Sequence, residues 1–243
     1  MVNIGRSIQM NLDTYQKINQ HSDNLFTLDA KLAKNPIGRR MTVIRLKNNE
    51  LALHSPVFLE GKIKSSLDEL GQVAYILVPN EWHTLDTKKV HDQYPESKIM
   101  VPFGLRDRLA IKFPVSGTYD KDWTAPISEE LDVFSVNGLK KPEVVFFHYA
   151  SKTLIVADLF FNFNHDDFSG ITKFLMNFNQ ATRFNTTRFY QWSMIKNKSE
   201  FRASLDEMNK KWDIDKVIMG HGHIVDANGR QNILSVIQNF PNG

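Results

Sequence analysis

The chain has 243 residues, no cysteine, and a net charge of +3 from 30 basic and 27 acidic residues. This length suits one large domain or two small ones, and so small a charge gives no support for a nucleic-acid-binding protein. Without cysteine, disulfides and thiolate metal sites are excluded, so His, Asp or Glu would have to bind any metal ion. No apolar run reaches the length of a membrane span and no signal-peptide core is present, so we expect a cytoplasmic protein.

The first part of the sequence predicts mostly strands. Residues 1–21 are polar and predict a leader, loosely packed or forming a short helix, before a single domain over residues 22–243. Alternating apolar residues then predict strands, and these lie at residues 24–30, 41–46 and 50–59. Helical spacing over 63–70 ends at Gly71, and an apolar run at 73–79 predicts a strand buried on both faces.

The remaining patterns alternate helices with strands. Further helices are expected at residues 84–94, 201–212 and 232–240, and further strands at residues 97–102, 143–149, 153–161 and 215–219. Residues 103–126 have no regular pattern, and no linker divides the chain. These patterns predict an α/β fold, one domain with two sheets covered by helices.

The segment 160–192 is unusually aromatic. It contains eight of the 17 phenylalanines together with Tyr190 and Trp192. Because large apolar clusters are usually packed, we favour a helical core or a subunit interface, and thus a homodimer, over a binding platform. Arg183 and Arg188 lie among these rings, a mixture that could stack on RNA bases, but the modest charge argues against nucleic acid as a partner.

Two ionisable residues directly follow apolar strand patterns. Asp158 follows TLIVA, and His221 follows KVIMG and precedes a second glycine. Taken alone, such an Asp more often caps a turn or helix, and a single His more often packs in the core. Together they are harder to dismiss, because groups at the ends of two buried strands tend to meet at one rim. His223 would point away from His221, and His165 in NHDD fits a helix start.

The order of these motifs resembles the metallo-β-lactamase fold superfamily. TLIVADLFFN, a long insertion, a helix and DKVIMGHGHIV resemble its C-terminal half, and RMTVIRL, LHSPV and VPNEWH resemble its N-terminal half. The resemblance covers about residues 22–240. It implies a four-layer αββα sandwich with two mixed sheets flanked by helices, and it places Asp158 and His221 at metal-ligand positions.

The family's His-x-His-x-Asp-His motif is rewritten in this chain. Its four ligand positions hold Asn80, Trp82, Thr84 and Leu85. His83 lies one place off register and could still turn inward, and Asn80 could offer a carbonyl oxygen or orient substrate. His54-Ser55-Pro56 replaces the family's Asp-Thr-Gly and adds an imidazole near the rim, where His54 is a second candidate for substrate contact. The third ligand histidine has no counterpart, since His148 is too close to Asp158 along the chain.

These residues allow one metal ion at most. His83, Asp158 and His221, with His54 as an alternate, would hold a single Zn, Fe or Mn ion with an open position for water. Two metal ions would need more ligands than the sequence supplies. The resemblance therefore implies a mononuclear hydrolase of an ester, amide or phosphoester of unknown identity. The alternative is a binding or regulatory module that keeps the fold and has lost the metal.

Overall fold

Two mixed sheets form the centre of the fold. The computed structural model describes residues 15–32 and 35–240. The larger sheet of this part has seven strands in chain order, β1 (Tyr15–Ser22), β2 (Leu25–Leu32), β3 (Asn35–Arg45), β4 (Glu50–His54), β5 (Gln72–Leu77), β6 (Lys98–Val101) and β7 (Gly117–Thr118). The smaller sheet has the order β11 (Lys216–Ile218), β10 (Thr153–Ile155), β9 (Val144–His148) and β8 (Leu131–Ser135). Strands β1 to β4 pair antiparallel, whereas β4 to β7 and the pair β10–β11 are parallel.

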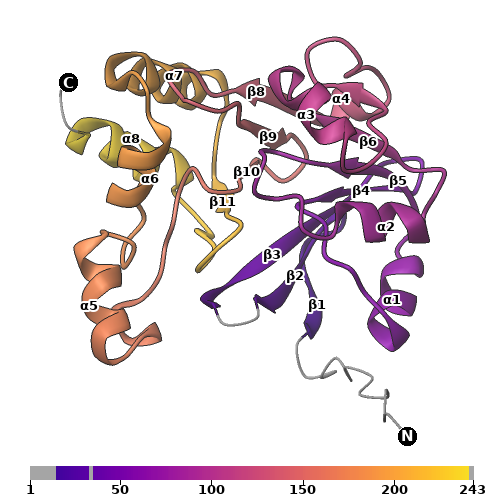
Figure 1. The fold of residues 1–243 in the computed structure, drawn as a ribbon, viewed down its shortest axis with the longest axis horizontal. Helices are drawn as coiled ribbons and strands as arrows, with labels where there is room; N and C mark the ends of the chain where they lie inside the picture. The colour runs from indigo at the N-terminus through magenta and orange to yellow at the C-terminus, as the bar shows by residue number, and fades with distance from the viewer. Residues whose placement is uncertain (1–14, 33–34, 241–243) are drawn as a thin grey trace, which may run out of the picture.

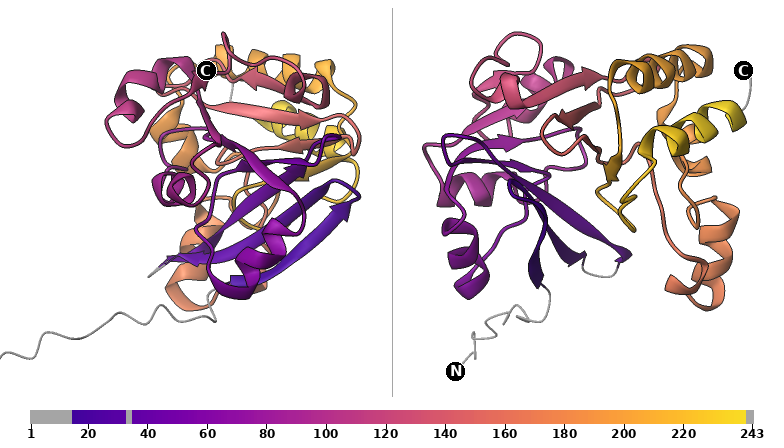
Figure 2. Two further views of the ribbon diagram at one scale, coloured as in Figure 1. Left: turned by 90° about the vertical axis from the view of Figure 1, so that its right-hand side faces the viewer. Right: turned by 180° about the vertical axis from the view of Figure 1, so that it is seen from behind.

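Helices cover the outer face of each sheet (Figures 1 and 2). The larger sheet is covered by α1 (Gly61–Asp68), α2 (Thr87–Gln93), η2 (Phe103–Leu105) and α3 (Arg106–Ala110), and α4 (Ile127–Glu130) precedes β8. The smaller sheet is covered by α6 (Arg188–Met194), α7 (Lys198–Lys211) and α8 (Gly229–Asn239). None of the helices within the described ranges is long and apolar enough to cross a bilayer.

Three apolar clusters separate four layers. Neighbouring residues of β9 show how, since Phe146 packs between the sheets while Phe147 packs toward the outer helices of the smaller sheet. On the other side, Ile44 of β3 faces the gap between the sheets and Val43 faces the helices of the larger sheet. Because successive side chains of a strand point to opposite faces, strands buried on both faces read as continuous apolar runs. The expected αββα sandwich is confirmed.

Among the differences from the sequence-based expectations, two concern the strands nearest the N-terminus. Strand β1 (Tyr15–Ser22) pairs with β2 at the edge of the larger sheet, so residues 15–21, expected within the leader, belong to an ordered strand. The remaining leader, residues 1–14, lies outside the described residues. The strand expected over 50–59 ends at His54, because Ser55 adopts a positive φ and turns the chain away from the sheet.

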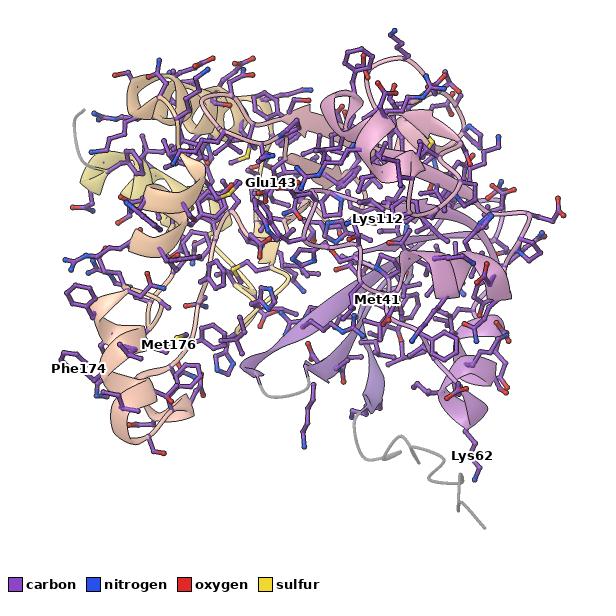
Figure 3. All side chains as sticks on the ribbon, in the orientation of Figure 1. Met41, Lys62, Lys112, Glu143, Phe174 and Met176 are labelled. Carbon is purple, nitrogen blue, oxygen red and sulfur yellow. The ribbon has the colours of Figure 1, made fainter. Side chains whose placement is uncertain are left out.

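The aromatic segment 160–192 is only partly core. Phe160, Phe163, Phe168 and Tyr190 are buried, as expected for a packed segment. In contrast, α5 (Gly170–Phe178) lies beside the sandwich, and its apolar residues at helical spacing are exposed: Ile171, Phe174, Leu175 and Phe178. Phe174 points away from the molecule, whereas Met176 points inward (Figure 3). Helix α5 therefore has an exposed apolar stripe on one side, and on the other side it lines part of the cavity described below.

Candidate metal centre

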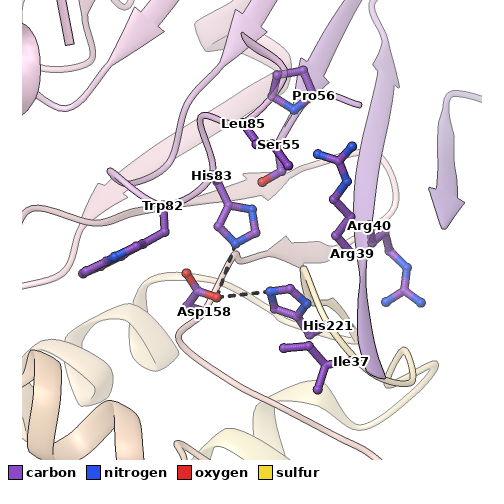
Figure 4. Close-up of a pocket in the computed structure, with 10 residues that line it drawn as sticks. All are labelled: Ile37, Arg39, Arg40, Ser55, Pro56, Trp82, His83, Leu85, Asp158 and His221. Carbon is purple, nitrogen blue, oxygen red and sulfur yellow. Dashed lines mark ion pairs between the residues drawn. The ribbon is translucent and has the colours of Figure 1, made fainter. Parts of the chain in front are cut away.

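His83, Asp158 and His221 meet at one rim of the sandwich (Figure 4). Asp158 and His221 follow β10 and β11, which are parallel neighbours, so both residues leave the same edge of the smaller sheet. His83 comes from the loop between β5 and α2. The Nε2 atoms of His83 and His221 lie 3.3 and 3.4 Å from the same oxygen, Oδ1 of Asp158.

The tautomer of His221 is set by a backbone carbonyl of β3. Nδ1 of His221 lies 2.7 Å from the carbonyl oxygen of Gly38, and since a carbonyl only accepts, Nδ1 must carry the proton. In the neutral ring, Nε2 then presents a lone pair toward the Asp158 carboxylate. A proton on Nε2 or a cation between the two atoms relieves this repulsion. A carbonyl that fixes the far nitrogen of an imidazole is also the usual support of a metal-binding histidine.

Two of the three distances between the ligand atoms have the spacing that a tetrahedral metal ion needs. The three ligand atoms all lie within 4.8 Å of one another. Tetrahedral zinc with ligands at about 2.0–2.1 Å requires neighbouring ligand atoms about 3.3 Å apart, which matches the two distances to Asp158. Two imidazoles and a carboxylate are also the nitrogen and oxygen donors that zinc, iron and manganese accept. The donor set therefore fits one divalent ion.

Asn80 holds the other oxygen of Asp158. Its amide donates to Oδ2 of Asp158 at 2.9 Å, and its own carbonyl accepts the backbone N–H groups of Trp82 and His83, both at 3.0 Å. Asn80 is 0% exposed. Its carbonyl thus accepts the hydrogen bonds that shape the loop carrying His83, while its amide holds Asp158 at the candidate metal centre.

The buried carboxyl group of Glu143 accepts a hydrogen bond from the backbone of Asp158. Oε1 of Glu143 accepts the backbone N–H of Asp158 at 3.2 Å, and Oε2 accepts the hydroxyl of Tyr190 at 2.8 Å. Burial, and then the negative charge of Asp158, raises the pKa of Glu143 to about 8. Burial also opposes ionisation of Asp158, but the nearby His83 and the hydrogen bonds of both histidines outweigh it and hold the pKa of Asp158 well below its usual range. Asp158 is therefore the carboxylate that carries the negative charge.

Arg40 fixes the loop that carries His221. Its Nη1 donates to the carbonyls of Met219 at 3.0 Å and Gly222 at 2.8 Å, and its Nε pairs with Asp29 at 2.7 Å.

The same loop comes too close to its neighbours for a side chain at Gly220, where a Cβ would lie 2.8 Å from Cε1 of His83. Glycine is required there to let His83 approach.

A cavity of about 200 Å³ opens over the three residues (Figure 4). Its other walls include Arg39, Ser55, Trp82 and Leu85. Arg39 pairs with Asp86 through Nη2, while its Nε and the Ser55 hydroxyl are buried without a hydrogen-bond partner among the described residues. Trp82 and Leu85, at two ligand positions of the family motif, contribute apolar surface instead of ligands.

His54, the alternate ligand and second candidate for substrate contact, does not join this group. It is 1% exposed and packs edge-on against Phe146 at 5.5 Å between ring centroids. Neither of its ring nitrogens has a hydrogen-bond partner in the described part of the chain. Burial, with a smaller contribution from His83, lowers the pKa of His54 to about 3. It is a neutral core residue behind the cavity.

The remaining histidines lie elsewhere. His148 is buried and its Nδ1 is 2.7 Å from the Ser151 hydroxyl. His223 is exposed and pairs with Asp167 at 2.7 Å. His165 begins the short helix η3 (His165–Asp167), where Asn164 and Asp167 form a capping box, in agreement with the expected helix start.

Sequence reasoning missed Arg39, Arg40, Ser55, Glu143 and Tyr190. All but Ser55 contact residues that are distant in sequence; Arg40, for example, contacts a carbonyl 182 residues away. The one available signal was chemical, since Glu143 is a charged residue at the start of an apolar strand and such a group needs a buried partner.

Comparisons with known proteins agree with this architecture. A family model described as "Domain of unknown function (DUF4336)" matches residues 23–180. None of the curated proteins matches the chain in sequence. Among solved structures, the DIM-1 metallo-β-lactamase superposes with a TM-score of 0.61 at 14% identity, over 91% of this chain and 96% of the other. A metallo-β-lactamase from Pontibacter korlensis gives 0.61 at 14% identity, over 92% and 99% of the two chains. One from Hirschia baltica gives 0.60 at 10% identity, over 91% and 97%.

Identities this low describe the fold and leave the activity open. The arrangement of the two sheets, the matched family model and the superpositions lead to one classification. The chain belongs to the DUF4336 family, and its fold is that of the metallo-β-lactamase superfamily.

Proposed function

We propose that this protein is a hydrolase of an ester, amide or phosphoester that uses one divalent metal ion bound by His83, Asp158 and His221. The observation that carries the proposal is the convergence of these three side chains on one point, with Oδ1 of Asp158 at 3.3 and 3.4 Å from the two imidazoles. A carboxylate and two imidazoles from distant segments rarely meet beneath a cavity without a ligand to bind.

The protein groups around the ion have separable roles. A divalent ion held by these residues would supply Lewis-acid chemistry, polarising a substrate oxygen and lowering the pKa of a water molecule. Asp158 and the two histidines hold that ion, and Asn80 and Glu143 hold Asp158 in place. Arg39 lines the same cavity, and its positive charge there would stabilise oxygen atoms that gain negative charge during hydrolysis. Water adds to the carbonyl or phosphoryl centre, the bond to the leaving group breaks, and the leaving group takes up a proton.

A second candidate function rests on the rewritten motif. Trp82 and Leu85 take two of the family's ligand positions and are exposed at the cavity. The protein would then be a regulatory module that binds a ligand without hydrolysing it. In such a module the hydrogen bonds of Asp158 would serve only to hold the loops in place. In that case Asp158→Asn and His221→Gln would change stability, and no hydrolytic activity would exist to lose.

Metal analysis separates the two candidates. Protein purified without a chelating tag and loaded with Zn, Fe or Mn should hold about one ion per chain, because the three ligands form one closed set. His221→Ala should lose this ion, while His223→Ala, two residues away and exposed, should keep it. No uptake by the wild-type protein in excess metal would refute the hydrolase.

Two expectations about partners stay predictions. The homodimer would use the stripe of Ile171, Phe174, Leu175 and Phe178 on α5, which is exposed in the single chain. The mass of the protein in sedimentation experiments tests the expected homodimer. The expected absence of nucleic-acid binding is tested by a filter-binding titration at two salt concentrations.

A further inference from the structure

A second, larger cavity adjoins the three residues on the side of α5 and α6. Its volume is about 470 Å³, and it shares Ile37, Trp82, Asp158 and His221 with the cavity that contains Arg39 and Ser55. Both volumes are reached from Asp158, so a molecule placed over this carboxylate can extend into either one. A cavity of this size is typical of a small-molecule site.

The larger cavity offers an apolar lining. Phe161, Met176, Phe189 and Met194 form much of its wall, and Phe161 stacks on the ring of His221 at 5.6 Å between centroids. The hydroxyl groups in this wall already take part in hydrogen bonds. The Tyr190 hydroxyl donates to Glu143 at 2.8 Å, and the Ser193 hydroxyl donates to the Phe189 carbonyl at 2.7 Å. This wall therefore favours a hydrocarbon group over a polar one.

The smaller cavity has the opposite character. Ser55 and Arg39 line it, and the Ser55 hydroxyl and Nε of Arg39 are buried behind its surface with no hydrogen-bond partner within the described ranges. Leaving such groups unsatisfied is costly, so they favour a ligand that brings its own polar atoms. Ser55 also holds a positive φ of 55°, which is uncommon for a residue other than glycine and orients its side chain at the turn after β4.

From these two walls we infer that the substrate is an amphiphile, an acyl ester or acyl amide with its hydrocarbon chain in the cavity between Phe161, Phe189 and Met194 and its polar group against Ser55. This inference rests on the proposed function for the reaction, because the bond to be cleaved then lies over Asp158. It goes further in naming the acyl group, which the metal centre alone does not select. The aromatic segment 160–192 thereby has a role in substrate binding through its inner face, in addition to its packed core.

The binding experiment uses protein stripped of metal with a chelator, so that the ion plays no part. Octanamide and acetamide share a head group and differ only in the chain, and each is titrated by NMR while the backbone amides are followed. Octanamide should shift the amides of Phe189, Met194 and Ser55 and bind at least about tenfold more tightly than acetamide, because only its chain fills the apolar wall. Equal binding of the two amides would overturn the inference.

Two exposed aromatic residues of α6 supply a matched pair of variants. Phe189 lines the cavity and is 64% exposed, and Trp192 is 77% exposed and lies outside the cavity lining. Phe189→Asp should weaken octanamide binding about tenfold, while Trp192→Asp should leave it within about twofold. Both changes lie at the surface and should leave the far-ultraviolet circular dichroism unchanged. Equal weakening by both would mean that the chain lies on the outer aromatic surface, against the inference.

The polar half has its own variant. Ser55→Ala should weaken octanamide about fivefold through loss of one hydrogen bond, and unchanged binding would remove Ser55 from the site. Metal uptake is measured separately on the wild-type protein. Octanamide binding without metal uptake would keep the cavity assignment and refute the hydrolase, whereas metal uptake without a preference for octanamide would do the reverse.

Discussion

Asn80 donates its side-chain amide to Oδ2 of Asp158 at 2.9 Å, which leaves Oδ1 of Asp158 to face His83 and His221. The two oxygens of this carboxylate thus have different surroundings: Oδ2 accepts a hydrogen bond from Asn80, and Oδ1 faces the two imidazoles. The same Asn80 side chain accepts two backbone N–H groups of the loop that carries His83. A residue without a ligand's role therefore positions two of the three candidate ligands.

Replacing Asn80 should weaken metal binding and stability together. Asn80→Ala leaves two partly buried backbone N–H groups and one carboxylate oxygen without their partner, which should lower the free energy of unfolding by about 3 kcal/mol. Supporting groups of this kind typically contribute about ten- to hundredfold to metal affinity. Urea unfolding and competition with a chelator measure the two effects. Asn239→Ala, an exposed amide on α8, should change neither, and metal affinity retained in Asn80→Ala would contradict this role.

The hydrogen bonds from Arg40 to Met219 and Gly222 predict that a change of Arg40 loosens mainly the loop that carries His221. Arg40→Met removes two hydrogen bonds to the carbonyls of Met219 and Gly222 and leaves Asp29 without its partner. Asp29 is 30% exposed, so the loss should cost less than the about 3–5 kcal/mol of a fully buried pair. Hydrogen exchange should quicken in residues 219–223 more than in the helices. Arg45→Met on the same strand, where the arginine bonds Asp23 at the surface, serves as the control; equal exchange rates in both variants would count against this role of Arg40.

A methyl group at Gly220 should open the site without removing a ligand. The added Cβ would lie 2.8 Å from Cε1 of His83 and 2.9 Å from the carbonyl oxygen of Ala157. His83 must then move, and Gly220→Ala should lose the metal ion while all three ligands remain in the sequence. Metal content after dialysis is the measurement. Gly61→Ala, where a Cβ meets nothing within 4 Å, should keep the ion, and an unchanged metal content in Gly220→Ala would show that the loop adapts.

The buried His54 predicts acid sensitivity. Burial and the charge of His83 lower its pKa from 6.5 to about 3, so between these values the unfolded chain binds a proton that the folded chain does not. The free energy of unfolding should therefore fall as pH decreases through this window, by about 3 kcal/mol between pH 6.5 and 4 from this residue. Burial of His148, with a pKa near 4, acts in the same direction.

His54→Leu tests this contribution by itself. The variant removes two unsatisfied nitrogens from the aromatic core, so its stability at pH 7 should equal or exceed that of the wild-type protein by about 1 kcal/mol. Its stability should also depend less steeply on pH, with His148 unchanged in both proteins. Thermal unfolding at several pH values between 4 and 7 gives both quantities. Parallel pH curves for the two proteins would rule out His54 as the source.

Local sequence patterns predicted most of the elements. The apolar alternation of residues 41–46 predicted β3, the apolar run at 73–79 predicted β5, and the spacing of Phe201, Leu205 and Met208 predicted α7. These patterns did not predict β1. This strand has a polar sequence and lies at the edge of the larger sheet, where it pairs with β2. A polar edge strand carries no apolar periodicity from which to recognise it.

The sequence by itself determined the layers and two candidate ligands, because strand periodicity and the residues that end a strand are local properties of the chain. Tertiary structure decided the rest. His83 and His54 were both open candidates as ligands, and only the folded chain turns His83 toward Asp158 while it buries His54 against Phe146. It also decided the use of the aromatic segment, which packs Phe160 in the core, places Phe189 on the cavity wall and leaves Phe174 outside. The physical reason is the same in each case: whether a side chain binds, packs or remains exposed depends on segments far away in the sequence that lie across from it.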